Sequence, residues 1–132
     1  MRSASNLALF LRPFAPQFAT WIDRSGQPDM PIKRVIDKID ANMRPWVRLL
    51  VAQHPDMDVQ ARWFDMLDEI ELEISDASTT LVTNRVARIT DQHAWASTYN
   101  QAHGEYLVAA DRIWSARKPL WAGEVTEWLE SI

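Results

Sequence analysis

The stretch from Asp58 to Ala77 constrains the fold more than any other part of the chain. Its apolar residues recur at steps of three, four and seven. They are Val59, Trp63, Met66, Leu67, Ile70, Ile74 and Ala77. At about 100° per residue these positions fall within one arc roughly 100° wide, which is typical of a helix that packs against a core. We therefore expect one long helix over this stretch, with its apolar side turned inward.

Another side of the same helix is acidic. Asp58, Asp65, Glu69, Leu72 and Asp76 share one face, and two further acids lie farther round. From position 56 to position 77 there are eight acidic residues and one basic residue, a local charge of −7, which leaves the rest of the chain at +3. Such a face is often only solvated. It can also pair internally with the basic segment from Pro31 to Gln53, which has a net charge of +3.

Prolines divide the first part of the chain into short helices. Pro13 and Pro16 interrupt the first apolar stretch, because a proline inside a helix costs about 3 kcal/mol. We expect two short helices here, the first capped by Ser5 or Asn6 and the second starting near Pro16.

Two more prolines organise the next helical stretch. Pro31 suits a first helical position. Pro45 lies inside an apolar run that continues to Val51, so it should kink or split the helix near Met43. Asp56 or Asp58 then caps the long helix.

The segment from 79 to 90 is open to two interpretations. Its β-branched residues and the Asn84-Arg85 pair permit a small β-hairpin. Val82, Val86 and Ile89 also have helical spacing, and we favour a helix that Ser78 or Thr79 caps and that reaches about Ile89. Further helices follow: Asp91 caps a long one, and the last one runs to the C-terminus.

The composition of the chain limits the fold classes that it can adopt. A chain of 132 residues is one domain by size, and its three glycines are too few for a turn-rich β architecture. The sequence thus predicts a single all-α domain over residues 1–132, a compact bundle of five to seven helices, several of them short and delimited by proline. The chain has no cysteine, which is typical of a reducing compartment and excludes thiolate sites.

Composition also limits the partners. A net charge of −4 makes nucleic acid an unsuitable partner, because phosphate binding needs clustered cations. No apolar run approaches the ~18 residues of a membrane span. The N-terminal run from Leu7 to Leu11 is too short for a secretory signal. We therefore expect a soluble cytoplasmic protein that binds neither nucleic acid nor membrane.

The tryptophans and histidines give no clear site. Six of the seven tryptophans fit the apolar stripes, so we expect a tryptophan-rich core, with Trp114 the one to test for exposure. His54, His93 and His103 lie too far apart to share a metal, and we expect them at the surface or its edge.

The carboxylates offer a catalytic alternative. Asp65 and Asp68, like Glu73 and Asp76, have a spacing at which all-α enzymes hold magnesium. The second pair is similar to the ExxD element of all-α nucleotide pyrophosphatases. Their companion element needs a third glutamate where this chain has Leu72. This alternative is a small metal-dependent hydrolase that uses the carboxylates of residues 65–76.

The function that we favour is a non-catalytic protein–protein interaction module, of the inhibitor, immunity, adaptor or virion-assembly type. It would present the acidic helix face, with apolar anchors inside a charged rim, to a basic partner protein. The expected partner-binding residues are Phe64, Asp65, Asp68, Glu69, Leu72 and Asp76. A homo-oligomer is an option, since positive and negative helices can pair across a two-fold axis. We expect no cofactor, metal or catalytic residue.

Overall fold

The computed structural model describes all residues from 1 to 132, and its regular structure is helical without any strand. The helices are α1 (Ala4–Leu11), α2 (Pro16–Ser25), α3 (Ile32–Asp37), α4 (Arg44–Val51), α5 (Met57–Ser78), α6 (Asn84–Val86), α7 (Gln92–Arg117) and α8 (Ala122–Ser131). A π-helical turn, Thr79–Thr83, joins α5 directly to α6. Counting α5 through α6 as one run gives seven helices, so the predicted all-α class and helix number are confirmed.

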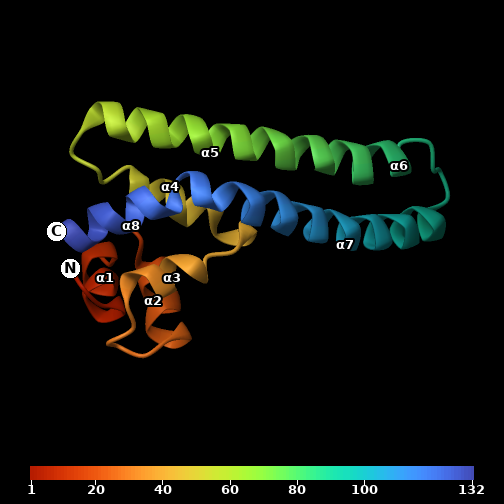
Figure 1. The fold of residues 1–132 in the computed structure, drawn as a ribbon. Helices are drawn as coiled ribbons and strands as arrows, with labels where there is room; N and C mark the ends of the chain where they lie inside the picture. The colour runs from red at the N-terminus through yellow and green to blue at the C-terminus, as the bar shows by residue number, and fades with distance from the viewer.

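Two long helices dominate the shape of the molecule. Figure 1 shows α5 and α7 side by side and antiparallel, with α6 and the connection to α7 at one end of the hairpin. The short helices α1–α4 and the C-terminal α8 gather at the other end, where both chain termini lie (Figure 1). The result is a helical hairpin whose far end extends beyond the packed base.

The predicted apolar stripe of α5 is confirmed as its core face. Trp63, Leu67, Ile70 and Ile74 are buried in a cluster of 25 apolar residues to which α1–α4, α7 and α8 also contribute. At about 1.5–3 kcal/mol for each large side chain, burial of this stripe is a substantial part of the stabilisation of the domain.

The predictions for Pro16 and Pro45 agree with the structure, whereas Pro31 lies one residue before the helix: its backbone is extended, and α3 begins at Ile32. Pro16 is the first residue of α2, and a 3-10 turn, Ala41–Met43, separates α3 from α4 next to Pro45. The predicted cap at Ser5 or Asn6 is wrong. Ser3 caps α1 instead, because its extended backbone lets its Oγ accept from the Asn6 amide. The backbone of Ala4 also donates to the Met30 carbonyl, so tertiary contact starts the helix earlier than the local sequence indicates.

The segment from 79 to 90 begins as a helix, as we favoured, but Ser78 and Thr79 do not cap it. Both residues have helical backbone angles. A cap needs an extended backbone, and nothing between 78 and 86 breaks the helix. The chain instead continues α5 through a π-helical turn, which accommodates an extra residue in the turn. Asp91 caps α7 as predicted, and its carboxylate accepts from the Ala94 amide at 2.8 Å.

Two tryptophans differ from expectation. Trp114 is buried, and its indole N–H donates to the Ile39 carbonyl at 2.8 Å. Trp121 and the segment after α3 cover the ring of Trp114. The helical wheel of α7 alone does not predict these contacts. Trp95 is 41% exposed, because it lies in the first turn of α7, near the far end of the hairpin (Figure 1). None of the helices is both long and apolar enough to cross a membrane.

Candidate functional site

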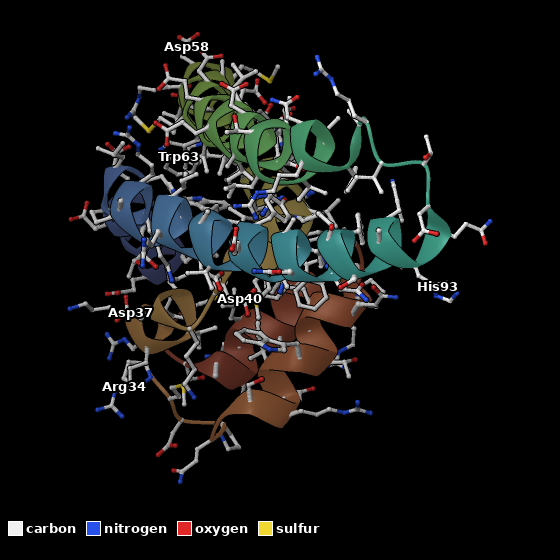
Figure 2. All side chains as sticks on the ribbon, turned by 90° about the vertical axis from the view of Figure 1, so that its right-hand side faces the viewer. Arg34, Asp37, Asp40, Asp58, Trp63 and His93 are labelled. Atoms are coloured by element: carbon white, nitrogen blue, oxygen red, sulfur yellow. The ribbon has the colours of Figure 1, made fainter.

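The rotation of α5 about its own axis decides which side chains face outward. The Asp56 carboxylate fixes the first turn, since it accepts from the amides of Asp58 and Val59 at 2.9 and 3.2 Å. Figure 2 views α5 nearly end-on: Asp58 points away from the rest of the molecule, and Trp63 lies on the side that faces α7 and α8. The core face and the acidic face therefore lie on opposite sides of one rod.

Three of the acids on α5 are paired within the chain. Arg44 Nε of α4 donates to Glu71 Oε2 at 2.8 Å, and Arg48 of α4 pairs with Asp68. Arg117, at the end of α7, pairs with Glu73. Internal pairing between α5 and the basic segment is thus correct for Asp68 and Glu71, and α7 supplies a further partner that the sequence did not indicate.

Two of the six predicted partner-binding residues belong to this internal contact. The ring of Phe64 is half-buried, and the Arg48 guanidinium carbon lies 5.9 Å from its centroid. The same guanidinium holds Asp68. Phe64 and Asp68 therefore line the contact between α4 and α5.

The other four predicted residues remain available on the surface. Asp65, Glu69 and Asp76 are exposed, and none forms an ion pair or a side-chain hydrogen bond within the chain. Leu72 lies among them with 66% of its surface exposed. Together with Asp58 they fall within about 60° on the helical wheel. We name these five residues, Asp58, Asp65, Glu69, Leu72 and Asp76, the acidic stripe.

One cation influences the stripe from its edge. The pKa of Arg117 is raised, first by its hydrogen bond and charge interaction with Glu73 and to a smaller extent by the charge of Glu69. No ion pair forms between Glu69 and Arg117 within 4 Å. The Glu69 carboxylate therefore has no ion-pair partner within the chain.

The geometry does not bring the carboxylates together as metal ligands. Nowhere in the chain do three or more His, Cys, Asp or Glu side chains lie close enough to hold an ion together. Of the residues proposed for a hydrolase, Asp68 and Glu73 are held by arginines from α4 and α7. The arrangement on α5 is a linear row of carboxylates along the helix rather than a converging set.

A polar cluster fixes the start of α5 to α8. The Trp63 indole N–H and the Arg62 guanidinium both donate to Glu124, at 2.9 and 2.7 Å. These donors hold the pKa of the Glu124 carboxyl below its usual range, with the Trp63 bond the largest cause. The ring of His54 lies 5.0 Å from that of Trp63 and 4.9 Å from that of Trp128. Arg62, Trp63 and Glu124 satisfy one another's polar groups, so we assign this cluster a structural role.

Lys118 has a similar structural role beside a surface hollow of about 500 Å³. Its ammonium donates to the carbonyls of Asp37 and Ile39, both at 2.8 Å, and so caps the end of α3. Burial lowers the pKa of Lys118, while the nearby carboxylates of Asp37 and Asp40 act in the opposite direction.

Sequence reasoning missed one further surface, which α2, α3 and Trp46 of α4 form. Trp21 and Trp46 are half-buried and line an open hollow of about 450 Å³ together with Arg24. Arg24 also lines a neighbouring hollow of about 580 Å³ beside Arg34 and Lys38. Arg24, Arg34 and Lys38 line these hollows, and Lys33 precedes Arg34 on α3. All four cations are exposed, and none has a carboxylate within 4 Å. We name this set, with the two tryptophans, the basic face.

The sequence indicates the basic face only in part. The charges of Lys33, Arg34 and Lys38 are visible in the sequence, but the apolar hollow needs α2 and α4 to meet. Trp46 stacks on Phe18 with ring centroids 5.4 Å apart, and this contact brings it next to Trp21. Comparisons with models of known protein families, with curated proteins and with solved structures find no match for this chain.

Proposed function

We propose that this protein is a non-catalytic protein–protein interaction module that binds a basic partner through the acidic stripe of α5. The observation that carries the proposal is the division of the α5 acids into two sets. Asp68, Glu71 and Glu73 neutralise arginines of the same chain, whereas Asp58, Asp65, Glu69 and Asp76 have no ion pair in it. Four like charges along one rod repel one another, and a cationic partner would relieve that repulsion.

Leu72 supports a docking role for the same face. It is a large apolar side chain in the middle of a charged row, with Glu69 one turn before it and Asp76 one turn after it. Interfaces commonly place an apolar anchor inside a polar rim, where burial of the anchor supplies affinity and the charges steer association. The remaining contacts of the interface would come from partner residues that pack along the exposed side of α5.

The test is affinity capture from the source cells with three forms of the full chain. The test variant carries Glu69→Lys and Asp76→Lys, and the matched control carries Glu127→Lys and Glu130→Lys on α8. All four positions are exposed and unpaired, so both variants change the net charge equally. We expect the native chain and the control to retain the same protein with a basic surface, and the test variant to lose it.

Added salt should weaken the capture, because exposed charge interactions are screened within about 10 Å at 0.1 M salt. If all three forms retain an identical set of proteins, the acidic stripe is not the docking surface and the proposal is wrong.

A further inference from the structure

We propose that the partner of the acidic stripe is a second copy of this chain, which binds through its basic face in a head-to-tail arrangement. This inference rests on the proposed function and adds the identity of the partner. The chain carries two exposed surfaces of opposite charge, and none of their charged side chains forms an ion pair within the chain; Lys38 donates instead to the Ser25 carbonyl at 2.9 Å.

The charges of the two surfaces match in sign and in kind. The acidic stripe offers four carboxylates free of ion pairs, and the basic face offers four exposed cations without a carboxylate within 4 Å. Asp29 is the only acid that lines the basic hollow. Guanidinium groups such as those of Arg24 and Arg34 form two-pronged hydrogen bonds with carboxylates, which fix orientation as well as sign.

The apolar parts of the two surfaces match as well. Leu72 projects from the acidic stripe between Glu69 and Asp76. The hollow between Trp21 and Trp46, about 450 Å³, has Arg24 on its rim. Leu72, with a carboxylate on either side, is complementary to this apolar hollow, which has cations beside it. The indole rings of Trp21 and Trp46 offer a large contact area for such an apolar anchor.

The positions of the two surfaces decide the symmetry. In Figure 1, α5 forms one long side of the molecule and α2 and α3 lie on the opposite side. Figure 2, from a direction 90° away, places Asp58 and Arg34 at opposite ends of the view. A two-fold axis would need both surfaces on one face, since each copy gives and receives the same contact. Surfaces that face opposite ways instead join copies head to tail, which builds open chains or rings.

The experiment is sedimentation velocity on the full chain over a range of concentrations at low ionic strength. One variant changes three of the five residues of the acidic stripe (Glu69→Gln, Leu72→Ala, Asp76→Asn). A second removes three of the four cations of the basic face (Arg24→Gln, Lys33→Gln, Arg34→Gln). Every changed side chain is exposed, and circular dichroism checks that both variants fold. A control variant, Glu127→Gln with Glu130→Gln, removes two acids from α8.

We expect the native chain and the control to form species larger than a dimer as concentration rises, and each test variant alone to stay monomeric. An equimolar mixture of the two test variants should form a dimer and nothing larger, because it retains a single intact stripe and a single intact basic face. A mixture that stays monomeric, or test variants that assemble as the native chain does, would overturn the proposal.

A native chain that is monomeric at every concentration also overturns the head-to-tail proposal. In that case the capture experiment still tests the proposed function independently. A foreign basic protein that the stripe retains would support the function and replace the second copy as partner.

Discussion

Trp63 joins α5 to α8, because its ring is buried in the core while its indole N–H donates to Glu124 of α8 at the surface. A few buried side chains of this kind contribute much of the stability of the molecule. They hold α5 at the rotation that turns Asp65, Glu69 and Asp76 outward, so the core face and the acidic stripe are consequences of the same packing.

The first prediction concerns this anchor. Trp63→Ala should lower the free energy of unfolding by about 3–5 kcal/mol, since it removes a large buried ring and leaves a cavity. Urea denaturation measures the change. Trp95→Ala is the matched control: Trp95 is partly exposed and stacks on Tyr99 at 5.1 Å, so its removal should cost about 1 kcal/mol. Equal costs at the two sites would mean that the α5 stripe is not core.

The second prediction concerns the pH dependence of stability at Glu124. Its pKa is lowered in the folded state by Trp63 and Arg62. The unfolded chain therefore binds this proton more readily, and the stabilisation is present above the unfolded pKa of about 4.3 and is lost as the pH falls through the folded pKa. Glu124→Gln should flatten the acid side of the stability profile, measured by thermal melting at a series of pH values. Glu127→Gln, which removes an exposed and unpaired carboxylate, should leave the profile unchanged.

At the scale of the elements, the sequence predicted where the helices lie in the chain better than it predicted which helices pack against each other. The three-and-four spacing of Trp63, Leu67, Ile70 and Ile74 identifies a core face because the period of the helix is fixed. The same wheel places Asp65, Glu69, Leu72 and Asp76 outward, and the structure agrees.

The side-chain contacts that the sequence did not predict are those between residues of different helices. Arg117 lies 44 residues after Glu73, and their pairing requires the antiparallel packing of α5 with α7. The hollow beside Trp21 likewise requires α4 to bring Trp46 to α2. Long-range contacts of this kind follow from the packing of whole helices and leave no local pattern, so the pair between Arg117 and Glu73 was not predictable.

The third prediction concerns α7. Gly104 is exposed in the middle of this helix, and a Cβ at that position would meet no atom within 4 Å. Gly104→Ala should therefore raise the free energy of unfolding by about 1 kcal/mol, because alanine loses less backbone freedom in a helix. Gly26→Ala should give no such gain, since its Cβ would lie 2.5 Å from Met30 Cε. Loss of stability in Gly104→Ala would contradict the open surface at this point of the hairpin.

The fourth prediction concerns metal binding along α5. A row of carboxylates that does not converge should not bind a divalent cation tightly, so magnesium or manganese should leave the melting temperature unchanged. A real site at 100-fold excess over its dissociation constant would add about 2.7 kcal/mol of stability. A rise in the melting temperature that Glu69→Gln with Asp76→Asn abolishes would restore the hydrolase alternative.

At the scale of the whole molecule, charge is segregated between its two sides. The segment from 56 to 77 has a charge of −7 and the rest of the chain has +3, and the internal pairs with α4 and α7 cancel only part of this difference. Figure 1 places α5 on the opposite side of the molecule from α2 and α3. The exposed acids Asp58, Asp65, Glu69 and Asp76 extend along α5. This polarity gives the molecule two surfaces of opposite charge.

The most direct test of the account is carboxylate footprinting by mass spectrometry, with carbodiimide and an amine as the label. The full chain is compared in dilute solution and in the assemblies isolated from its source cells. We predict that Asp65, Glu69 and Asp76 are labelled in dilute solution and protected in the assemblies, while Glu127 and Glu130 are labelled equally in both. Equal labelling of the stripe carboxylates in both states would contradict the central claim that this face of α5 is where the protein binds its partner.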